Sequence, residues 1–165
     1  PDEYRVTVPT EPQKMTVLIV PPMQEPYIKE ISTGLEALQK EVGGRIEVVY
    51  PFAEPVGLIC NDEGKNERME LNRALYDAED NMYDIIAGTF VLAGLSGDNF
   101  GSLDKDQIKQ FSERFAKPEM FMRINGKITA VEVKPSIKAK LDRLQKEQNN
   151  TDKPQPQKKP REETL

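Results

Sequence analysis

The chain has 165 residues, of which 37% are hydrophobic and 31% charged, and its formal net charge is −5. It contains no histidine and one cysteine, which excludes zinc fingers, Ser-His-Asp triads, Cys-His dyads, haem ligation through histidine and any intramolecular disulfide. The apolar runs are shorter than the roughly 20 residues that cross a bilayer, so we expect no membrane span. Cys60 lies in an apolar run and is expected to be a buried, inert thiol.

Charge is unevenly distributed along the chain. Residues 15–117 contain 18 acidic and 10 basic side chains, whereas residues 134–165 contain 9 basic and 5 acidic ones. An acidic body repels the phosphate backbone of nucleic acids, so only a weak nucleic-acid contact through the basic tail is left open. An acidic surface suits a basic partner instead.

The first half of the chain predicts several strands. Residues 1–14 contain a short alternating run at 4–8, followed by Pro9 and Pro12, which predicts a linker or at most one edge strand. The folded domain is expected to begin at Met15. Apolar, β-branched runs predict strands at residues 16–20, 27–31, 46–50 and 56–60.

A helix is predicted at about residues 34–42. Its apolar residues at helical spacing are Leu35, Leu38 and Val42. Thr33 is expected to be the N-cap and Glu36 to complete a capping box, while Gly43 begins a left-handed stop. In the following strand, alternation predicts that Tyr50 shares the buried face.

The second half is less regular. Three segments show no clear helix or strand pattern. They are predicted to form a turn at 61–64, a charged stretch at 65–82 that includes an acidic loop at 77–81, and a loop at 95–102. Gly64 in the first of these turns is able to take a positive φ angle. Residues 83–93 are predicted to form one central strand with a bulge at Gly88.

A second helix, at about residues 105–116, is predicted from the capping residues Asp104 and Gln107. After it, Asn125-Gly126 predicts a hairpin between strands at 120–124 and 128–133. A basic amphipathic helix and a polar, disordered tail are expected at 135–147 and 148–165.

The predicted fold class is therefore α+β, with a small mixed or antiparallel sheet, two packed helices, a C-terminal β-hairpin and a basic helix before a disordered tail. The expected organisation is a linker or edge strand at 1–14, an α+β domain at 15–117, a hairpin extension at 118–134, the basic helix at 135–147 and the tail at 148–165.

The candidate binding residues form two polar pairs. Asn72 and Arg73 lie between apolar residues, and an arginine there suits a carboxylate or phosphate that Asn72 helps to orient. The alternative for Arg73 is an ion pair that stabilises the fold. Asn61 and Asp62 form a turn with oxygen ligands for a hard cation, although such residues also favour turns by bonding their own backbone.

No catalytic set, metal site or cofactor is predicted. Oxygen-bearing side chains between Asp98 and Asp106 do not match the ligand spacing of an EF-hand, and helix capping explains them better. The glycines between residues 88 and 101 lack the Gly-Lys-Ser or Gly-Lys-Thr sequence of a phosphate loop.

The ordered series of blocks from Thr16-Val-Leu-Ile-Val-Pro-Pro through Leu71-Asn-Arg-Ala-Leu to the run ending at Gly94 resembles a known family. The resemblance is to domain of unknown function 3846, an uncharacterised bacterial family of conjugative elements and phages, and covers about residues 15–117. It implies a cytoplasmic accessory protein of mobile DNA, often one module of a larger chain. It transfers no activity and no functional residue.

Three hypotheses on function follow. The first is a non-enzymatic interaction module whose acidic surface engages a basic host or element-encoded protein, or other modules of a larger chain. The second is a small-molecule or nucleotide-derivative binder, or an unfamiliar hydrolase, centred on Asn72 and Arg73. The third is a structural spacer between other modules.

Overall fold

The computed structural model of the protein describes residues 13–133. The expected edge strand at 4–8, the basic helix at 135–147 and the tail at 148–165 lie outside these residues. No helix within the described residues is long and apolar enough to cross a membrane.

Residues 13–133 contain ten strands and two helices. The strands are β1 (Lys14–Val20), β2 (Tyr27–Ser32), β3 (Ile46–Val49), β4 (Val56–Asn61), β5 (Leu71–Tyr76), β6 (Met82–Ala87), β7 (Phe90–Ser96), β8 (Asn99–Gly101), β9 (Glu119–Ile124) and β10 (Lys127–Glu132). The helices are α1 (Leu35–Val42) and α2 (Lys105–Arg114). The predicted α+β class is confirmed.

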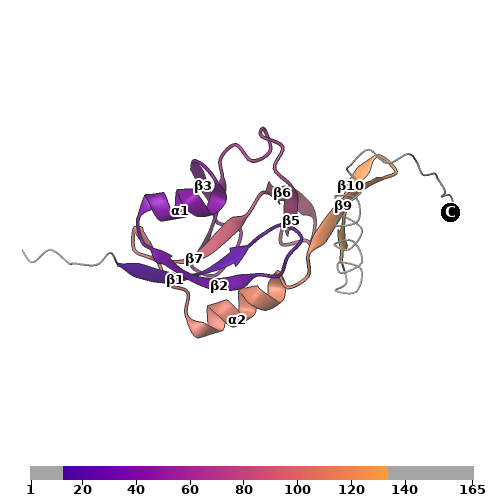
Figure 1. Ribbon diagram of the computed structural model, residues 1–165. Coiled ribbons are helices and arrows are strands. Elements are labelled where there is room, and N and C mark those ends of the chain that lie inside the picture. The colour runs from indigo at the N-terminus through magenta and orange to yellow at the C-terminus, as the bar shows by residue number, and fades with distance from the viewer. Residues whose placement is uncertain (1–12, 134–165) are drawn as a thin grey trace, which may run out of the picture. The chain divides into compact units, whose positions relative to one another are not determined.

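The main sheet has six antiparallel strands in the order β2-β1-β7-β4-β3, with β8 pairing to β7. Figure 1 shows α1 and α2 on opposite sides of this sheet. The strand pairs β5–β6 and β9–β10 each form a separate two-stranded antiparallel sheet. The sheet of the α+β fold is thus antiparallel, within the alternatives that the sequence predicted.

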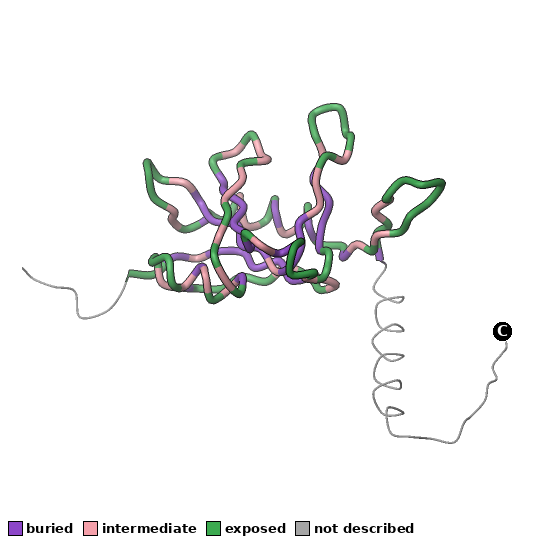
Figure 2. Tube along the Cα trace, turned by 90° about the horizontal axis from the view of Figure 1, so that it is seen from above, coloured by how far each residue is buried: buried purple, intermediate pink, exposed green. Residues whose placement is uncertain are grey.

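β1 is buried along most of its length because a helix covers each face of the sheet. Met15, Val17 and Ile19 belong to the cluster under α1, whereas Leu18 and Val20 belong to the cluster under α2. A strand covered on both faces needs apolar side chains at consecutive positions, which explains the unbroken run that predicted it. Figure 2 shows the buried residues gathered in the middle of the fold, and mostly exposed residues in the connecting loops and the C-terminal hairpin.

The two helix starts differ. α2 has the predicted capping box, in which the Asp104 carboxylate accepts from the Gln107 backbone N–H at 2.8 Å and the Gln107 side chain accepts from Asp104 N–H at 3.0 Å. The capping box predicted for α1 is wrong, because its N-cap is Gly34 and no side chain caps it. Thr33 instead continues the β1–β2 pairing by donating its N–H to the Gln13 carbonyl at 3.0 Å. Its backbone is held by the sheet, so the helix begins one residue later.

The single strand predicted for residues 83–93 is also wrong. Gly88 has a φ angle of +83°, and the chain there leaves β6, which pairs with β5, and enters β7 in the main sheet. A Cβ atom at Gly88 would lie 2.8 Å from the Met69 sulfur, so glycine is required by both backbone and space. β7 does occupy the centre of the sheet, as predicted for this run.

Other corrections concern exposure and loops. Tyr50 is 63% exposed rather than buried, and Leu35, one of the apolar residues at helical spacing, is 56% exposed. The loop predicted at 95–102 contains the end of β7 and all of β8. Gly64 does not have a positive φ angle. Glycine is required there for space, because a Cβ atom would lie 2.8 Å from the Ala87 carbonyl oxygen.

The C-terminal hairpin matches its prediction. Asn125 and Gly126 have φ angles of +52° and +79°, as a type I′ turn requires, and β9 and β10 pair over six positions. The hairpin contacts β5.

The two helix starts give a matched test of capping. We expect Asp104→Ala to lower the free energy of unfolding by about 1 kcal/mol, because it removes the acceptor for a first-turn N–H. Thr33→Ala is the control and should change stability by less than about half that amount, since Thr33 is not a side-chain cap. Urea denaturation of both variants measures the difference. Equal losses in the two variants would contradict the assigned helix starts.

Candidate functional site

Asn72 and Arg73 lie at the start of β5, and both are completely buried. The Asn72 amide nitrogen donates to the Val20 carbonyl at 2.8 Å and to the Gly88 carbonyl at 2.9 Å. Its side-chain oxygen accepts from Arg73 Nη1 at 2.7 Å. The predicted pairing of the two side chains is therefore present, and Asn72 orients the guanidinium.

The Arg73 guanidinium binds backbone carbonyl groups from distant segments. Its Nη2 donates to Gln24 O and to Phe115 O, each at 2.8 Å. Phe115 is the C-cap of α2, where carbonyl groups carry the negative end of the helix dipole. Nε has no hydrogen-bond partner within the described residues.

Arg73 thus has carbonyl oxygens where sequence analysis placed a carboxylate or phosphate. No carboxylate lies within ion-pair distance of it among residues 13–133. Burial lowers the pKa of Arg73 to about 10, and the charge of Glu119 opposes that shift. The side chain remains charged at neutral pH and is covered on all sides by protein.

Glu119, at the start of β9, is a neighbour of this cluster that sequence analysis did not identify. Its carboxylate accepts from the Ala74 backbone N–H at 2.9 Å and so connects the C-terminal hairpin to β5. Burial raises the pKa of Glu119, while the Ala74 hydrogen bond and the Arg73 charge lower it. The bond joins residues 45 positions apart, for which local sequence gives no signal.

Asn61 and Asp62 lie at the end of β4. The buried Asn61 side chain donates to the Val42 carbonyl at 3.1 Å and accepts from the Glu63 N–H at 2.7 Å, so it stabilises the turn. Asp62 pairs with Arg45 at 2.8 Å on the surface. Both side chains therefore bond within the protein itself.

A cavity of about 310 Å³ adjoins this turn, and its lining includes Asn61, Asp62, Lys65 and Asp84. Lys65 and Asp84 form an ion pair at 2.5 Å. Neither Asn72 nor Arg73 lines this cavity. The structure therefore places the two predicted polar pairs in different environments and does not combine them in one pocket.

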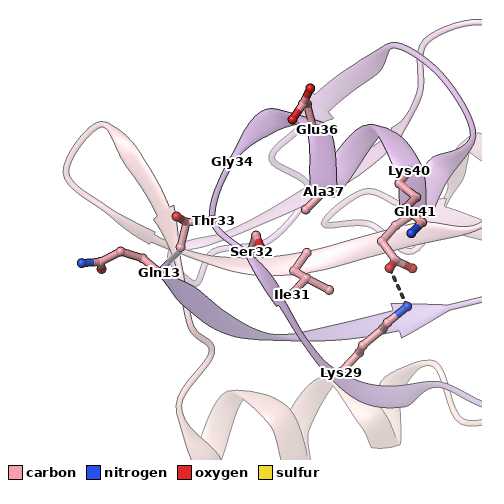
Figure 3. A pocket seen from close by; sticks show the side chains of 10 residues that line it. All are labelled: Gln13, Lys29, Ile31, Ser32, Thr33, Gly34, Glu36, Ala37, Lys40 and Glu41. Carbon is pink, nitrogen blue, oxygen red and sulfur yellow. Dashed lines mark hydrogen bonds and ion pairs between the residues drawn. The ribbon is translucent and has the colours of Figure 1, made fainter. Parts of the chain in front are cut away.

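A larger cleft, of about 740 Å³, lies between β2 and α1 and was not predicted. Figure 3 shows Ile31 and Ala37 between these elements, with the Lys29 ammonium bonded to the Glu41 carboxylate at 2.7 Å. Lys40 and Glu36 also line the cleft, so its charges are mixed. Sequence alone gave no signal for it, because the register of β2 beside the helix is set by tertiary pairing.

Across residues 13–133, no group of three or more His, Cys, Asp or Glu side chains is placed to hold a metal ion. Asp104, from the acidic stretch before α2, caps that helix. Cys60 is buried as predicted, and burial raises its pKa to about 11, so it is a thiol rather than a reactive thiolate at neutral pH.

A family model described as Domain of unknown function (DUF3846) matches residues 15–116. The chain belongs to this family. The matched region contains the main sheet from Met15 onward, both helices and, among the described residues, every hydrogen-bond partner of the Arg73 side chain, whereas Glu119 and the β9–β10 hairpin follow it. No curated protein and no solved structure matches the chain significantly.

Arg73 should be a major contributor to stability. We expect Arg73→Ala to lower the free energy of unfolding by about 3 kcal/mol or more, because it leaves buried acceptors on Asn72 and Phe115, and the partly buried Gln24 carbonyl, without donors. Arg73→Lys keeps the charge but not the planar fork and should recover only part of the loss. Chemical denaturation gives both values. A loss below about 1 kcal/mol for the alanine variant would show that the buried bonds contribute little.

Glu119 should make stability depend on pH. Its ordinary pKa is 4.5 and its folded-state pKa is higher, so above about pH 4.5 the folded chain retains a proton that the unfolded chain has released. Its contribution to stability is therefore largest below that pH and declines as the pH rises through the folded-state pKa. In Glu119→Gln, urea denaturation over a pH series should lose this decline. An unchanged pH profile would refute the assignment to Glu119.

Proposed function

We propose that this domain is a non-enzymatic interaction module of a bacterial mobile element, and that it acts in the cytoplasm by engaging a basic protein partner through an acidic surface. The observation that carries the proposal is the exposed turn between β5 and β6. Asp77, Glu79 and Asp80 are exposed there, and the sequence contains no lysine or arginine between Arg73 and Lys105.

The Glu79 and Asp80 carboxylates of this turn are accessible to a partner. Asp77 accepts from the backbone N–H groups of Glu79 and Asn81 at 3.0 Å and 2.9 Å, which fixes the shape of the turn. The Glu79 and Asp80 carboxylates form no ion pair with described residues. Unpaired carboxylates on a rigid turn attract a basic partner and make its association dependent on salt.

The location of Arg73 favours this proposal over a ligand-binding domain or hydrolase centred on Asn72 and Arg73. A ligand anchor needs access to a pocket, and the Arg73 side chain is fully buried and bonded to carbonyl groups. Two alternatives remain predictions from sequence. One is that the partner is another module of a larger chain, and the other is a weak nucleic-acid contact through the basic tail.

Partner capture at low and high salt tests the proposal. The full chain, the double variant Glu79→Gln/Asp80→Asn and the control Asp98→Asn/Glu113→Gln are each used to capture proteins from a bacterial lysate, followed by mass spectrometry. The two variants have the same net charge, so only the position of the lost charge differs. We expect a basic protein that is released by salt, lost with the first variant and retained by the control. Capture that is identical for all three chains would contradict the proposal.

A further inference from the structure

β2 is an edge strand with an unpaired side. Within residues 13–133 it pairs only with β1, over six consecutive positions without a bulge. The other edge, β3, is shorter, with four residues, and ends before Pro51. A regular six-residue edge offers a row of backbone N–H and C=O groups to another strand.

The register identifies which groups of β2 are free. Thr33 N–H donates to the Gln13 carbonyl, so that position is a hydrogen-bonded pair of the β1–β2 ladder. Hydrogen-bonded and non-bonded pairs alternate in an antiparallel ladder. The backbone groups of Tyr27, Lys29 and Ile31 therefore bond β1. Those of Ile28 and Glu30 point to the free edge.

The surroundings of this edge suit an added strand. The Ile28 side chain is 57% exposed and lies on the same face of β2 as Glu30, which is also exposed. On the opposite face, Lys29 and Ile31 border the cleft of about 740 Å³ beneath α1. A strand paired to β2 would place alternate side chains beside Ile28 and Glu30 and the others at the cleft, which is how domains recognise extended peptides.

A second copy of the chain fits this edge poorly. In two-fold antiparallel pairing of β2 with itself, the central registers set Lys29 against Lys29 or Glu30 against Glu30, and like charges directly opposite destabilise a ladder. The register centred on Ile28 sets Glu30 against Pro26, which has no N–H to donate. These registers disfavour a second copy and favour a partner strand of different sequence.

We propose that the free edge of β2 accepts an extended segment of a partner polypeptide as an added strand, with a basic side chain opposite Glu30 and an apolar side chain opposite Ile28. The inference rests on the proposed function in that the partner is a basic protein. It adds the conformation of the bound segment and its register. The contact does not involve the β5–β6 turn.

A designed peptide tests this binding mode on the full chain. The probe is the dye-labelled hexapeptide Thr-Val-Lys-Thr-Val-Tyr, whose lysine aligns with Glu30 and whose second valine aligns with Ile28. Fluorescence anisotropy should show saturable binding. Methylation of the backbone nitrogen of the lysine, which faces β2, should weaken binding about tenfold. Methylation of the second threonine nitrogen, which faces away, is the control and should have little effect.

Protein variants provide a second measurement. Ile28→Pro removes an N–H that faces outward and should weaken binding about tenfold, whereas Ile28→Thr keeps the edge. If the proline variant does not fold, Glu30→Lys takes its place: it should weaken the lysine peptide and bind the peptide in which glutamate replaces lysine. No saturable binding, equal effects of the two methylations, or no exchange of charge preference would overturn the inference. Peptide binding should be unchanged in Glu79→Gln/Asp80→Asn, so failure of the acidic-turn proposal is distinguishable from failure at this edge.

Discussion

The buried side chains of Asn72 and Arg73 bond β5 to several parts of the chain that are distant in sequence. Through them, β5 is bonded to the end of β1, to the loop that follows it, to the turn between β6 and β7, and to the C-cap of α2. Burying a guanidinium is costly unless its donors are satisfied. Here four donated bonds from two adjacent side chains reach backbone carbonyls, and a fifth joins the pair. The position of the β5–β6 hairpin relative to the main sheet and α2 depends on this cluster.

The same cluster affects the character of the surface. Arg73 is the one charged side chain among residues 13–133 that is buried, and a cation is thereby withdrawn from an already acidic body. The hairpin that it holds carries the acidic β5–β6 turn at its tip, with no lysine or arginine nearby in the sequence. The β5–β6 hairpin thus contains both a buried cation, Arg73, and the exposed carboxylates of its turn. This links the packing of the fold to the proposed attraction of a basic partner.

The cluster around Arg73 lies inside the region that matches the family, whereas the β9–β10 hairpin follows that region. Among residues 13–133, the hydrogen-bond partners of the Arg73 side chain all lie within 15–116, so the buried cluster belongs to the region that matches the family. The β9–β10 hairpin follows that region and bonds to β5 through the Glu119 carboxylate and the Ala74 N–H. A two-stranded hairpin is marginal by itself. Its attachment to β5 therefore depends on a single partly buried carboxylate beside Arg73, together with the packing of β9.

Local sequence determined those features whose causes are local. The Asp104 capping box, the Asn125-Gly126 turn and the apolar runs of β1 and β4 were all predictable, because each depends on residues a few positions apart. Sequence also singled out Asn72 and Arg73 as unusual, but not their partners. Tertiary structure decided the rest. The backbone of Thr33 pairs with β1 and does not cap α1, and the chain passes from one sheet to another at Gly88 within one apolar run. The segment that contains Arg73 forms a buried strand. These outcomes depend on contacts between distant residues, such as Arg73 with Phe115, whose geometry exists only once the chain has folded.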